Sequence, residues 1–583
     1  MIKKLARHLG QYKKYVFLTP VFILLDVVAE LMMPLLMSRI IDVGVVYKDI
    51  AYIGRTGLLM VLLALIAIVC GVIFMRLSTV GAMGFGANLR NGLFEKVQQF
   101  SFTNIDRFST ASLVTRLTND VNNVQMTFLM ALRILFRAPL MLIIAFVLAY
   151  SINARLSLVL GLAIPVLVIA IALILRTAFS RFAVMQQRID ALNSTIQENL
   201  IGQRVVKAFV RQDHENAKFK GSNDALMAAA IRAISIVILN MPVMMLVMSG
   251  ATIAIIWRGG NMVYGGELGA GQLLSFLSYV IQILMSVMMI SMIFVMSARA
   301  QASGVRVVEV LEAEVDIADK AGVEQAPGGG PQVSAGRVEF RDVVFRYNAT
   351  GSGEDVLSDI DFTAEPGEVI GIVGGTGSGK TTLVSLIPRL YDVTAGAVLV
   401  DGVDVRDYTL DSLREAIGVV AQTNTLFSGT IRENLLWGRA DATQAEIVQA
   451  CRDAQAHDFI MSFPDGYETI LGQGGVNLSG GQKQRLTIAR AMLKKPKILI
   501  LDDSTSAVDS ATEARIRDSF YSNLAQTTIF IIAQRISSVR NADKILVLDD
   551  GKIVGMGDHE TLLQTNKVYQ EINQSQGEGV LAQ

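Results

Sequence analysis

Hydrophobic residues in the first half of the chain gather in long runs, whereas in the second half they form short runs separated by polar segments. A helix that crosses a bilayer needs roughly 20 apolar residues. Six runs of this kind each predict a membrane-spanning helix: about 16–41, 57–80, 133–151, 156–176, 234–257 and 269–297. No small-residue cleavage site follows the first run, so we expect a retained span and not a signal peptide.

The polar segments between these spans alternate between long and short ones. The segments at about 81–132 and 177–233 keep a helical periodicity of apolar positions, so we expect them to continue the spans as helices. The segments at about 42–56, 152–155 and 258–268 are short. Basic residues precede the first span (Lys3, Lys4, Arg7, Lys13 and Lys14). By the positive-inside rule they predict a cytoplasmic N-terminus, with the long segments and the C-terminal half on the same side.

The first span contains ionisable residues. Asp26 and Glu30 are four residues apart, with Pro34 four further on, so the three share one helix face. Charged groups inside a membrane cost a few kcal/mol unless they face protein or water. Two interpretations are open: a polar feature of a translocation path, or a structural pair hydrogen-bonded to neighbouring spans.

Spans five and six are rich in methionine, whose flexible thioether adapts to different apolar shapes. An adaptable surface for an apolar or amphipathic substrate and ordinary helix packing are both compatible with this pattern. The residues are Met241, Met244, Met245, Met248, Met285, Met288, Met289, Met292 and Met296.

After the last span, the composition turns to Ala, Gly, Pro and Gln between about Asp319 and Gly336, which predicts a flexible linker. Beyond it, strands and helices alternate. Continuous apolar runs such as Ile498 to Leu501 and Ile529 to Ile532 are typical of parallel strands covered on both faces. We therefore predict an all-α six-helix transmembrane domain (1–318), a linker (319–336) and an α/β P-loop domain (337–583).

Composition limits the classes of partner. The 583-residue chain is 52% hydrophobic and 18% charged, and its 52 basic side chains balance its 52 acidic ones. A neutral balance argues against nucleic acid as a partner. The two cysteines, Cys70 and Cys451, fall in different segments and predict neither a disulfide framework nor a metal site.

A glycine-rich stretch carries the clearest chemistry. Gly374 to Thr381 fits G-x-x-x-x-G-K-[ST], after a predicted strand (Val369 to Val373) and before a predicted helix (Thr382 to Arg389). In that setting, backbone N–H groups surround a polyphosphate. Lys380 is expected to reach the β- and γ-phosphates and Thr381 to ligate Mg²⁺. The expected cofactors are ATP and Mg²⁺.

Three further motifs follow in order. IGVVAQ ends at Gln422, LSGGQKQR spans Leu478 to Arg485, and KILILDDSTSAVD spans Lys497 to Asp509. With this order of motifs after a six-span domain, the chain resembles an ATP-binding-cassette (ABC) exporter of the half-transporter type, over nearly its whole length. ABC importers are disfavoured, because their membrane and ATP-binding parts are usually separate chains.

The resemblance implies roles for residues that match the family's motifs. Tyr347 resembles the aromatic residue that stacks on adenine. Gln422 and Asp502 resemble the Mg²⁺-contacting residues of the Gln loop and Walker B strand, and metal ligation is thus expected from Thr381, Gln422 and Asp502. Ser506 to Asp509 resembles the D-loop at the dimer interface. Segments around Phe102 to Leu113 and Phe209 to Phe219 resemble coupling helices.

Two groups of residues are then expected to contact ATP. The phosphate loop comprises Gly374, Gly375, Thr376, Gly377, Ser378, Gly379, Lys380, Thr381 and Thr382. The signature comprises Ser479, Gly480, Gly481 and Gln482, which in the family cap ATP held by the other cassette; Asp509 completes the set.

Two positions depart from the family pattern. The residue after the Walker B aspartate is normally glutamate, the base for the attacking water, and here it is Asp503. Its side chain is one methylene shorter, and displacement of about 1 Å can cost roughly a hundredfold in rate. The family's switch histidine is replaced by Gln534, which cannot become a cation or exchange protons at neutral pH.

Both departures in one site predict a cassette that binds ATP but hydrolyses it poorly. The complete signature would then serve a competent site on a second, non-identical half-transporter, as in heterodimeric exporters. The expected location is the cell membrane, in contact with the lipid bilayer. The alternatives are a homodimeric exporter with slow ATPase and an ATP-gated regulator or channel without uphill transport.

Overall fold

The computed structural model describes residues 1–320, 330–347, 353–503 and 508–581. Its contacts form two compact units. One comprises Met1–Gln98 and Thr110–Ala313, and the other comprises Gln99–Ser109 and Glu314–Gln583. Residues 321–329 of the expected linker lie outside the described residues, as do Ser504 to Ala507.

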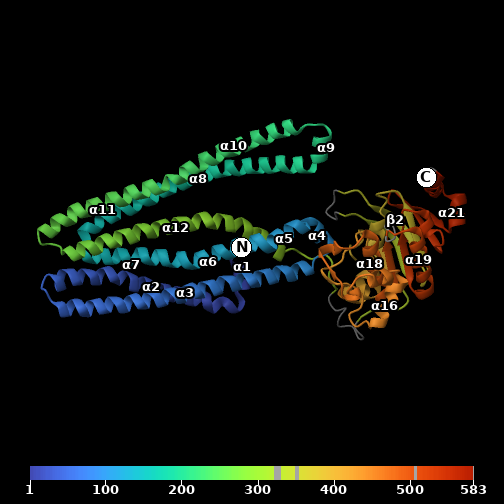
Figure 1. Cartoon of the computed structure of the whole chain (residues 1–583), viewed down its shortest axis with the longest axis horizontal. Helices are drawn as coiled ribbons and strands as arrows, with labels where there is room; N and C mark the ends of the chain where they lie inside the picture. Colours follow the sequence, from blue (N-terminus) through green and yellow to red (C-terminus); the bar gives the residue numbers. More distant parts are fainter. Residues whose placement is uncertain (321–329, 348–352, 504–507, 582–583) are drawn as a thin grey trace. The chain divides into compact units, whose positions relative to one another are not determined.

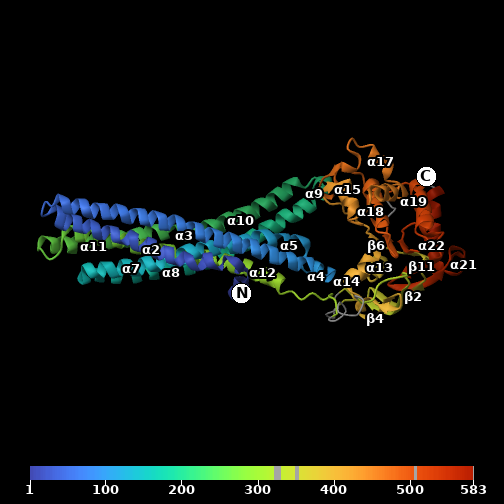
Figure 2. The same ribbon diagram turned by 90° about the horizontal axis from the view of Figure 1, so that it is seen from below.

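The first unit consists of helices joined by short turns, with no strand among its described residues (Figures 1 and 2). Five of the six predicted spans fall within helical segments long and apolar enough to cross a membrane, and the sixth, at about 269–297, overlaps such a segment at Ala270–Ile290. The helices are α1 (Ile2–Leu5), α2 (Lys13–Arg39), α3 (Ile50–Gln98), α5 (Thr110–Thr115), α6 (Val121–Met130), α7 (Phe136–Ile152), α8 (Ala154–Ile201), α9 (Gln203–Ala208), α10 (Gln212–Ile238), α11 (Asn240–Tyr264) and α12 (Ala270–Leu311).

Two of the predicted spans lie in much longer continuous helices. Helix α3 has 49 residues and α8 has 48. At 1.5 Å per residue, each is about 70 Å long, more than twice the thickness of a bilayer core of about 30 Å. In both ribbon views α8 and α10 run side by side.

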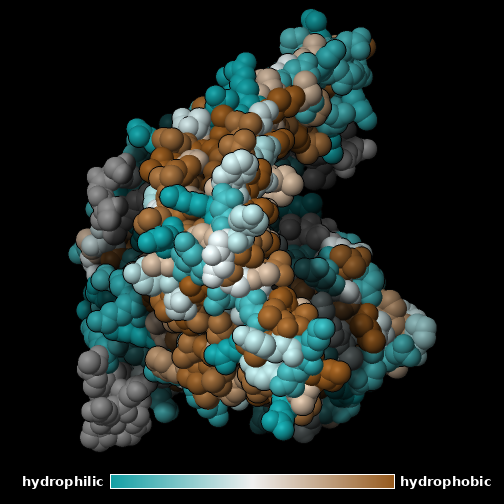
Figure 3. All heavy atoms as spheres, turned by 90° about the vertical axis from the view of Figure 1, so that its left-hand side faces the viewer, coloured by the Kyte–Doolittle hydropathy of each residue, from teal (hydrophilic) through white to brown (hydrophobic). Residues whose placement is uncertain are grey.

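Apolar side chains of this unit face both inward and outward. Ile23, Leu31 and Phe276 are fully buried in its core. Phe17 and Leu246, by contrast, are about three-quarters exposed, at 76% and 75%. Figure 3 shows brown, apolar side chains over much of the surface of the helical unit that faces the viewer. An apolar exterior of this extent matches a helical unit whose solvent is lipid.

Of the methionines in spans five and six, some are buried in the core of the helical unit and others are exposed. Met244 is buried in the helical core, with Met248, Met288 and Met289 packed against it. Met241, Met245 and Met285 are exposed. The side chains of Met292 and Met296 lie outside the described residues.

The second unit is an α/β domain built on two main sheets. In its principal sheet, the order is β12-β11-β3-β10-β9-β6, and the neighbours from β11 to β6 run parallel. An antiparallel sheet has the order β2-β1-β4-β5, and β7 pairs with β8. The strands are β1 (Val338–Phe345), β2 (Leu357–Ala364), β3 (Val369–Gly374), β4 (Ala395–Val400), β5 (Val403–Asp404), β6 (Ile417–Val420), β7 (Gly429–Thr430), β8 (Ile470–Leu471), β9 (Ile498–Asp502), β10 (Thr528–Ile532), β11 (Lys544–Asp549) and β12 (Lys552–Gly557).

Helices cover the principal sheet and bury its apolar strands, as the continuous apolar runs predict. The helices of this unit that follow β3 are α13 (Lys380–Ser385), α14 (Leu410–Glu415), α15 (Ile431–Leu436), α16 (Gln444–Asp453), α17 (His457–Met461), α18 (Gly480–Leu493), α19 (Ser510–Asn523), α20 (Ile536–Val539), α21 (His559–Thr565) and α22 (Lys567–Leu581). The helix predicted at Thr382 to Arg389 is shorter than expected. Pro388 disfavours helical backbone at the residue before it, and Arg389 has a φ of 50°.

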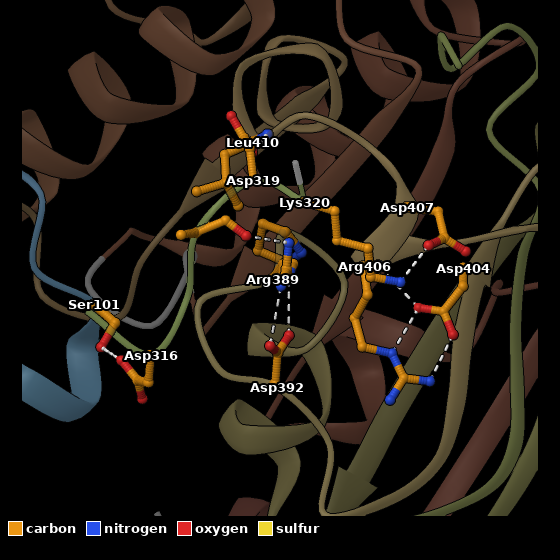
Figure 4. Close-up of polar contacts among 12 residues, drawn as sticks. Ser101, Asp316, Asp319, Lys320, Arg389, Asp392, Asp404, Arg406, Asp407 and Leu410 are labelled. Atoms are coloured by element: carbon orange, nitrogen blue, oxygen red, sulfur yellow. Dashed lines mark hydrogen bonds and ion pairs between the residues drawn. The ribbon is translucent and has the colours of Figure 1, made fainter. Parts of the chain in front are cut away.

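One short helix from between the spans belongs to the α/β unit. Helix α4 (Phe102–Phe108) has a capping box in which Ser101 accepts from Asn104 N–H. The Asn104 amide donates to Glu314 O (3.0 Å), and Ser101 also donates to Asp316 (Figure 4). On the cassette, Tyr391 OH donates to Asp106 Oδ2 (3.0 Å). Helix α4 therefore packs on the cassette, at the first position where the resemblance implied a coupling helix.

Most of the second implied coupling segment, Phe209 to Phe219, forms the start of α10. The short helix between α8 and α10 is α9 (Gln203–Ala208), and α10 already begins at Gln212. Gly202 provides the break that ends α8.

Candidate nucleotide-binding site

The sheet order brings the predicted motifs to one edge. Strands β3, β10, β9 and β6 are adjacent and parallel, so their carboxyl ends meet at the same side. Gly374 ends β3, Asp502 ends β9, and Gln534 and Gln422 each lie two residues beyond β10 and β6. Ligands of open α/β sheets bind at this edge.

The glycine-rich loop adopts backbone conformations that favour glycine. The φ angles of Gly374, Gly377 and Gly379 are 156°, 85° and 91°. A Cβ on Gly374 would lie 2.1 Å from Leu548 O, whereas a Cβ on Gly377 would meet nothing within 4 Å. The loop is thus packed on its inner side and open at its tip, which leaves its backbone accessible to a polyphosphate.

Lys380 folds over this loop. Its Nζ donates to Gly374 O (2.9 Å), Gly375 O (2.6 Å) and Ser378 Oγ (3.3 Å). Burial lowers the pKa of Lys380, while the carboxylates of Asp502 and Asp503 oppose that shift. A cation beside the open tip of the loop matches the charge of a polyphosphate.

Oxygen ligands for a divalent cation lie next to the loop. Thr381 Oγ1 donates to Asp502 Oδ2 (2.9 Å), and Asp502 is only 6% exposed. Burial raises the pKa of Asp502, opposed by the Thr381 hydrogen bond. One hydroxyl and one carboxylate fit Mg²⁺, which prefers oxygen ligands and is completed by phosphates and water. Among the described residues, no three His, Cys, Asp or Glu side chains form a metal cluster.

The two departing residues contact each other. Gln534 Nε2 donates to Asp503 Oδ2 (2.9 Å). Burial raises the pKa of Asp503, while hydrogen bonds from Gln422 and Gln534 and the charges of Lys380 and Arg535 lower it. The carboxylate of Asp503, directly after β9, therefore accepts hydrogen bonds from side-chain amides, which do not exchange protons at neutral pH.

One residue of this network is not suggested by any motif. Gln576 of α22 donates from Nε2 to Gln534 O (2.7 Å) and accepts at Oε1 from Ile536 N–H (2.9 Å). Its side-chain amide thus binds the backbone of the residue before Arg535 and of the residue after it. No sequence pattern signals this contact, because it joins positions about 40 residues apart.

The predicted adenine-stacking residue lies near the loop. Tyr347 OH and Thr382 Oγ1 are 2.8 Å apart. The ring meets Phe345 and Tyr391 edge-on, with centroids 4.9 Å and 5.3 Å away, and remains 42% exposed. It therefore offers an accessible aromatic surface beside Thr382.

The signature forms the first turn of a long helix. Ser479 caps α18: its hydroxyl oxygen accepts from Gln482 N–H, and Ser479 N–H donates to Gln482 Oε1 (2.9 Å). Ser479 and Gly480 are exposed. Asp509 caps α19 through Thr512 N–H (2.9 Å), whereas Ser506 of the expected D-loop lies outside the described residues. Backbone N–H groups at the start of a 14-residue helix are suited to meet an anion from another chain.

Comparisons with known proteins agree with this architecture. Residues 16–287 match the model of the ABC transporter transmembrane region, and residues 357–506 match that of the ABC transporter domain. An ABC transporter ATP-binding protein of Bacillus subtilis, YfiB, is 38% identical over 99% of this chain and 98% of its own length. The chain belongs to the ABC transporter family.

Further relatives of this ABC transporter narrow its type. An ATP-dependent lipid A-core flippase of Syntrophus aciditrophicus is 38% identical over 84% of this chain and 80% of its own. The structure of a bacterial Atm1-family ABC exporter with ATP bound has a TM-score of 0.78, 25% identity, and coverage of 97% and 99% of the two chains. The protein is a multi-pass, ATP-driven exporter of the half-transporter type, with its membrane and ATPase domains fused.

Proposed function

We propose that this chain is the subunit of a heterodimeric ABC exporter whose own ATP site retains ATP and hydrolyses it slowly. The observation that carries the proposal is the hydrogen bond between Asp503 and Gln534. A general base must reach the attacking water, and the short Asp503 side chain is instead held by amide donors. Neither amide takes up or releases a proton during turnover.

The binding part of the same site is intact. The glycine-rich loop, Lys380 and the Thr381–Asp502 pair have the geometry described above. We assign the phosphate contacts to residues 374–382, Mg²⁺ to Thr381, Asp502 and Gln422, and adenine stacking to Tyr347. The signature, Ser479 to Gln482, would cap ATP on a partner half-transporter that supplies glutamate and histidine at the two departing positions.

The transport cycle follows from this asymmetry. Closure of two cassettes on two ATP molecules opens the membrane cavity outward, and hydrolysis at the partner's site resets it. ATP retained at this chain's site biases the two-state equilibrium toward engaged cassettes. The relatives named as lipid A-core flippases support an amphipathic substrate, and the basic residues before the first apolar run support a cytoplasmic N-terminus and cassette.

Purification and single-turnover kinetics test the proposal. Expressed with its own genomic neighbours, the tagged chain is expected to co-purify with a different half-transporter. Alone, it is expected to bind ATP–Mg²⁺ and to turn it over very slowly. An assembly of two identical copies with rapid ATPase activity would refute the proposal, and ATP binding without any substrate uptake into inside-out vesicles would favour the regulator or channel instead.

A further inference from the structure

A cavity of about 490 Å³ lies among α2, α3 and α7 in the helical unit. Its wall combines three charged side chains, Asp26, Glu30 and Arg137, with an apolar remainder that includes Met33, Phe74 and Met75. Among the described residues that line the cavity, only these three are charged. A pocket with apolar walls and a few polar groups is the usual form of a small-molecule site.

The charges of Asp26, Glu30 and Arg137 do not sum to zero. Arg137 donates from Nη1 to Asp26 Oδ2 (2.5 Å) and from Nη2 to Glu30 Oε2 (2.6 Å). One guanidinium thus serves two carboxylates, which leaves a formal surplus of one negative charge. The second oxygen of Asp26 lies 3.6 Å from the position that a Cβ on Gly71 would take, at the cavity wall.

Helix packing does not require this surplus. Asp26 is the middle residue of α2 and only 5% exposed, so its charge lies where ionised groups cost a few kcal/mol. One carboxylate would suffice to pair Arg137. A second carboxylate on the same guanidinium adds cost and no new helix contact, since both acids stand on α2.

We propose that this cavity binds the cationic group of an amphipathic substrate. The inference rests on the proposed export of an amphipathic compound, and it adds that this compound carries a positive charge. The surplus carboxylate compensates the cation, and the methionines and Phe74 contact the apolar part. Phe74 already faces a cation, with the Arg137 guanidinium 5.8 Å from its ring centroid.

The first test uses two isosteric ions of opposite charge. Radiolabelled tetraphenylphosphonium and tetraphenylborate are titrated against the full-length chain, purified with its partner in lipid nanodiscs. Saturable binding is expected for the cation alone. Glu30→Gln keeps a hydrogen-bonding side chain beside Arg137 but removes the surplus charge, so we expect about tenfold weaker cation binding; Glu30→Asp should retain it. Equal binding of both ions, or none of the cation, overturns the proposal.

The second test fills the cavity beside Asp26 while leaving all three charged side chains in place. Gly71→Leu projects into the cavity and should abolish cation binding. Gly57→Leu is the matched control, because a Cβ there meets nothing within 4 Å and the position is not part of the cavity wall. It lies about 21 Å away along α3. Cation binding unchanged by both Gly71→Leu and Glu30→Gln would place the cation elsewhere and refute the site. Neither result bears on partner identity or ATP turnover, so the proposed function is tested separately.

Discussion

Asp503 and Gln534 are single-residue departures that act together because each satisfies the other's hydrogen bond. Restoring both should therefore have a larger effect than restoring either. We expect Asp503→Glu with Gln534→His to raise hydrolysis at this site at least about tenfold, since a properly placed base recovers part of a roughly hundredfold loss. The measurement is single-turnover ATP hydrolysis by assemblies that also carry Ser479→Arg. That substitution disables the signature that serves the partner's ATP site, so the remaining hydrolysis comes from this chain's own site. An unchanged rate in the double variant would show that other elements limit the site.

A single hydroxyl, that of Thr381, joins the phosphate loop to Asp502. Thr381→Ala should weaken ATP–Mg²⁺ binding about tenfold while leaving ATP binding in EDTA nearly unchanged, since only the metal-dependent part uses the hydroxyl. Thr381→Ser keeps the oxygen and is the control. Nucleotide titration with and without Mg²⁺ measures the difference. Equal weakening under both conditions would contradict Mg²⁺ ligation by Thr381.

At the scale of elements, α22 supports the segment that carries Gln534. Gln576→Leu removes two hydrogen bonds to that backbone, each contributing on the order of 1 kcal/mol. We expect amide hydrogen exchange at Ile536 to rise about fivefold or more. Gln574→Leu is the control on the same helix, because Gln574 is exposed. Unchanged exchange at Ile536 in the Gln576 variant would mean that α22 does not support the segment.

Elements with a strong local pattern were predictable from the sequence, and contacts between distant elements were not. The apolar runs predict the spans and the buried strands, and the resemblance of the motifs to those of the family predicts which residues share the nucleotide site. The partner of Asp26 and Glu30 was left open, since Arg137 is more than 100 residues away. Gln576 was missed for the same reason. Helical periodicity also conceals the break between α8 and α9 at Gly202.

On the scale of the whole molecule, we expect the phosphate loop and the signature of one chain to contact two different ATP molecules. The loop around Lys380 would hold the chain's own nucleotide, whereas the exposed Ser479 caps the start of α18 and would face the partner's nucleotide. In a homodimer the two sites are equivalent, so a variant in either motif impairs both. In the proposed heterodimer they are not, and the two motifs become separable by kinetics.

Ser479→Arg and Lys380→Ala separate these cases. Ser479→Arg places a bulky cation at the first turn of α18, so it should reduce steady-state ATPase activity of the assembly by about a hundredfold, because the partner's competent site loses its cap. Lys380→Ala should abolish ATP retention by this chain but lower steady-state activity only severalfold, because the site it removes contributes little turnover. Photolabelling with azido-ATP reports which subunit retains nucleotide. Losses of equal size in the two variants would indicate equivalent sites, and with them an exporter of two identical chains.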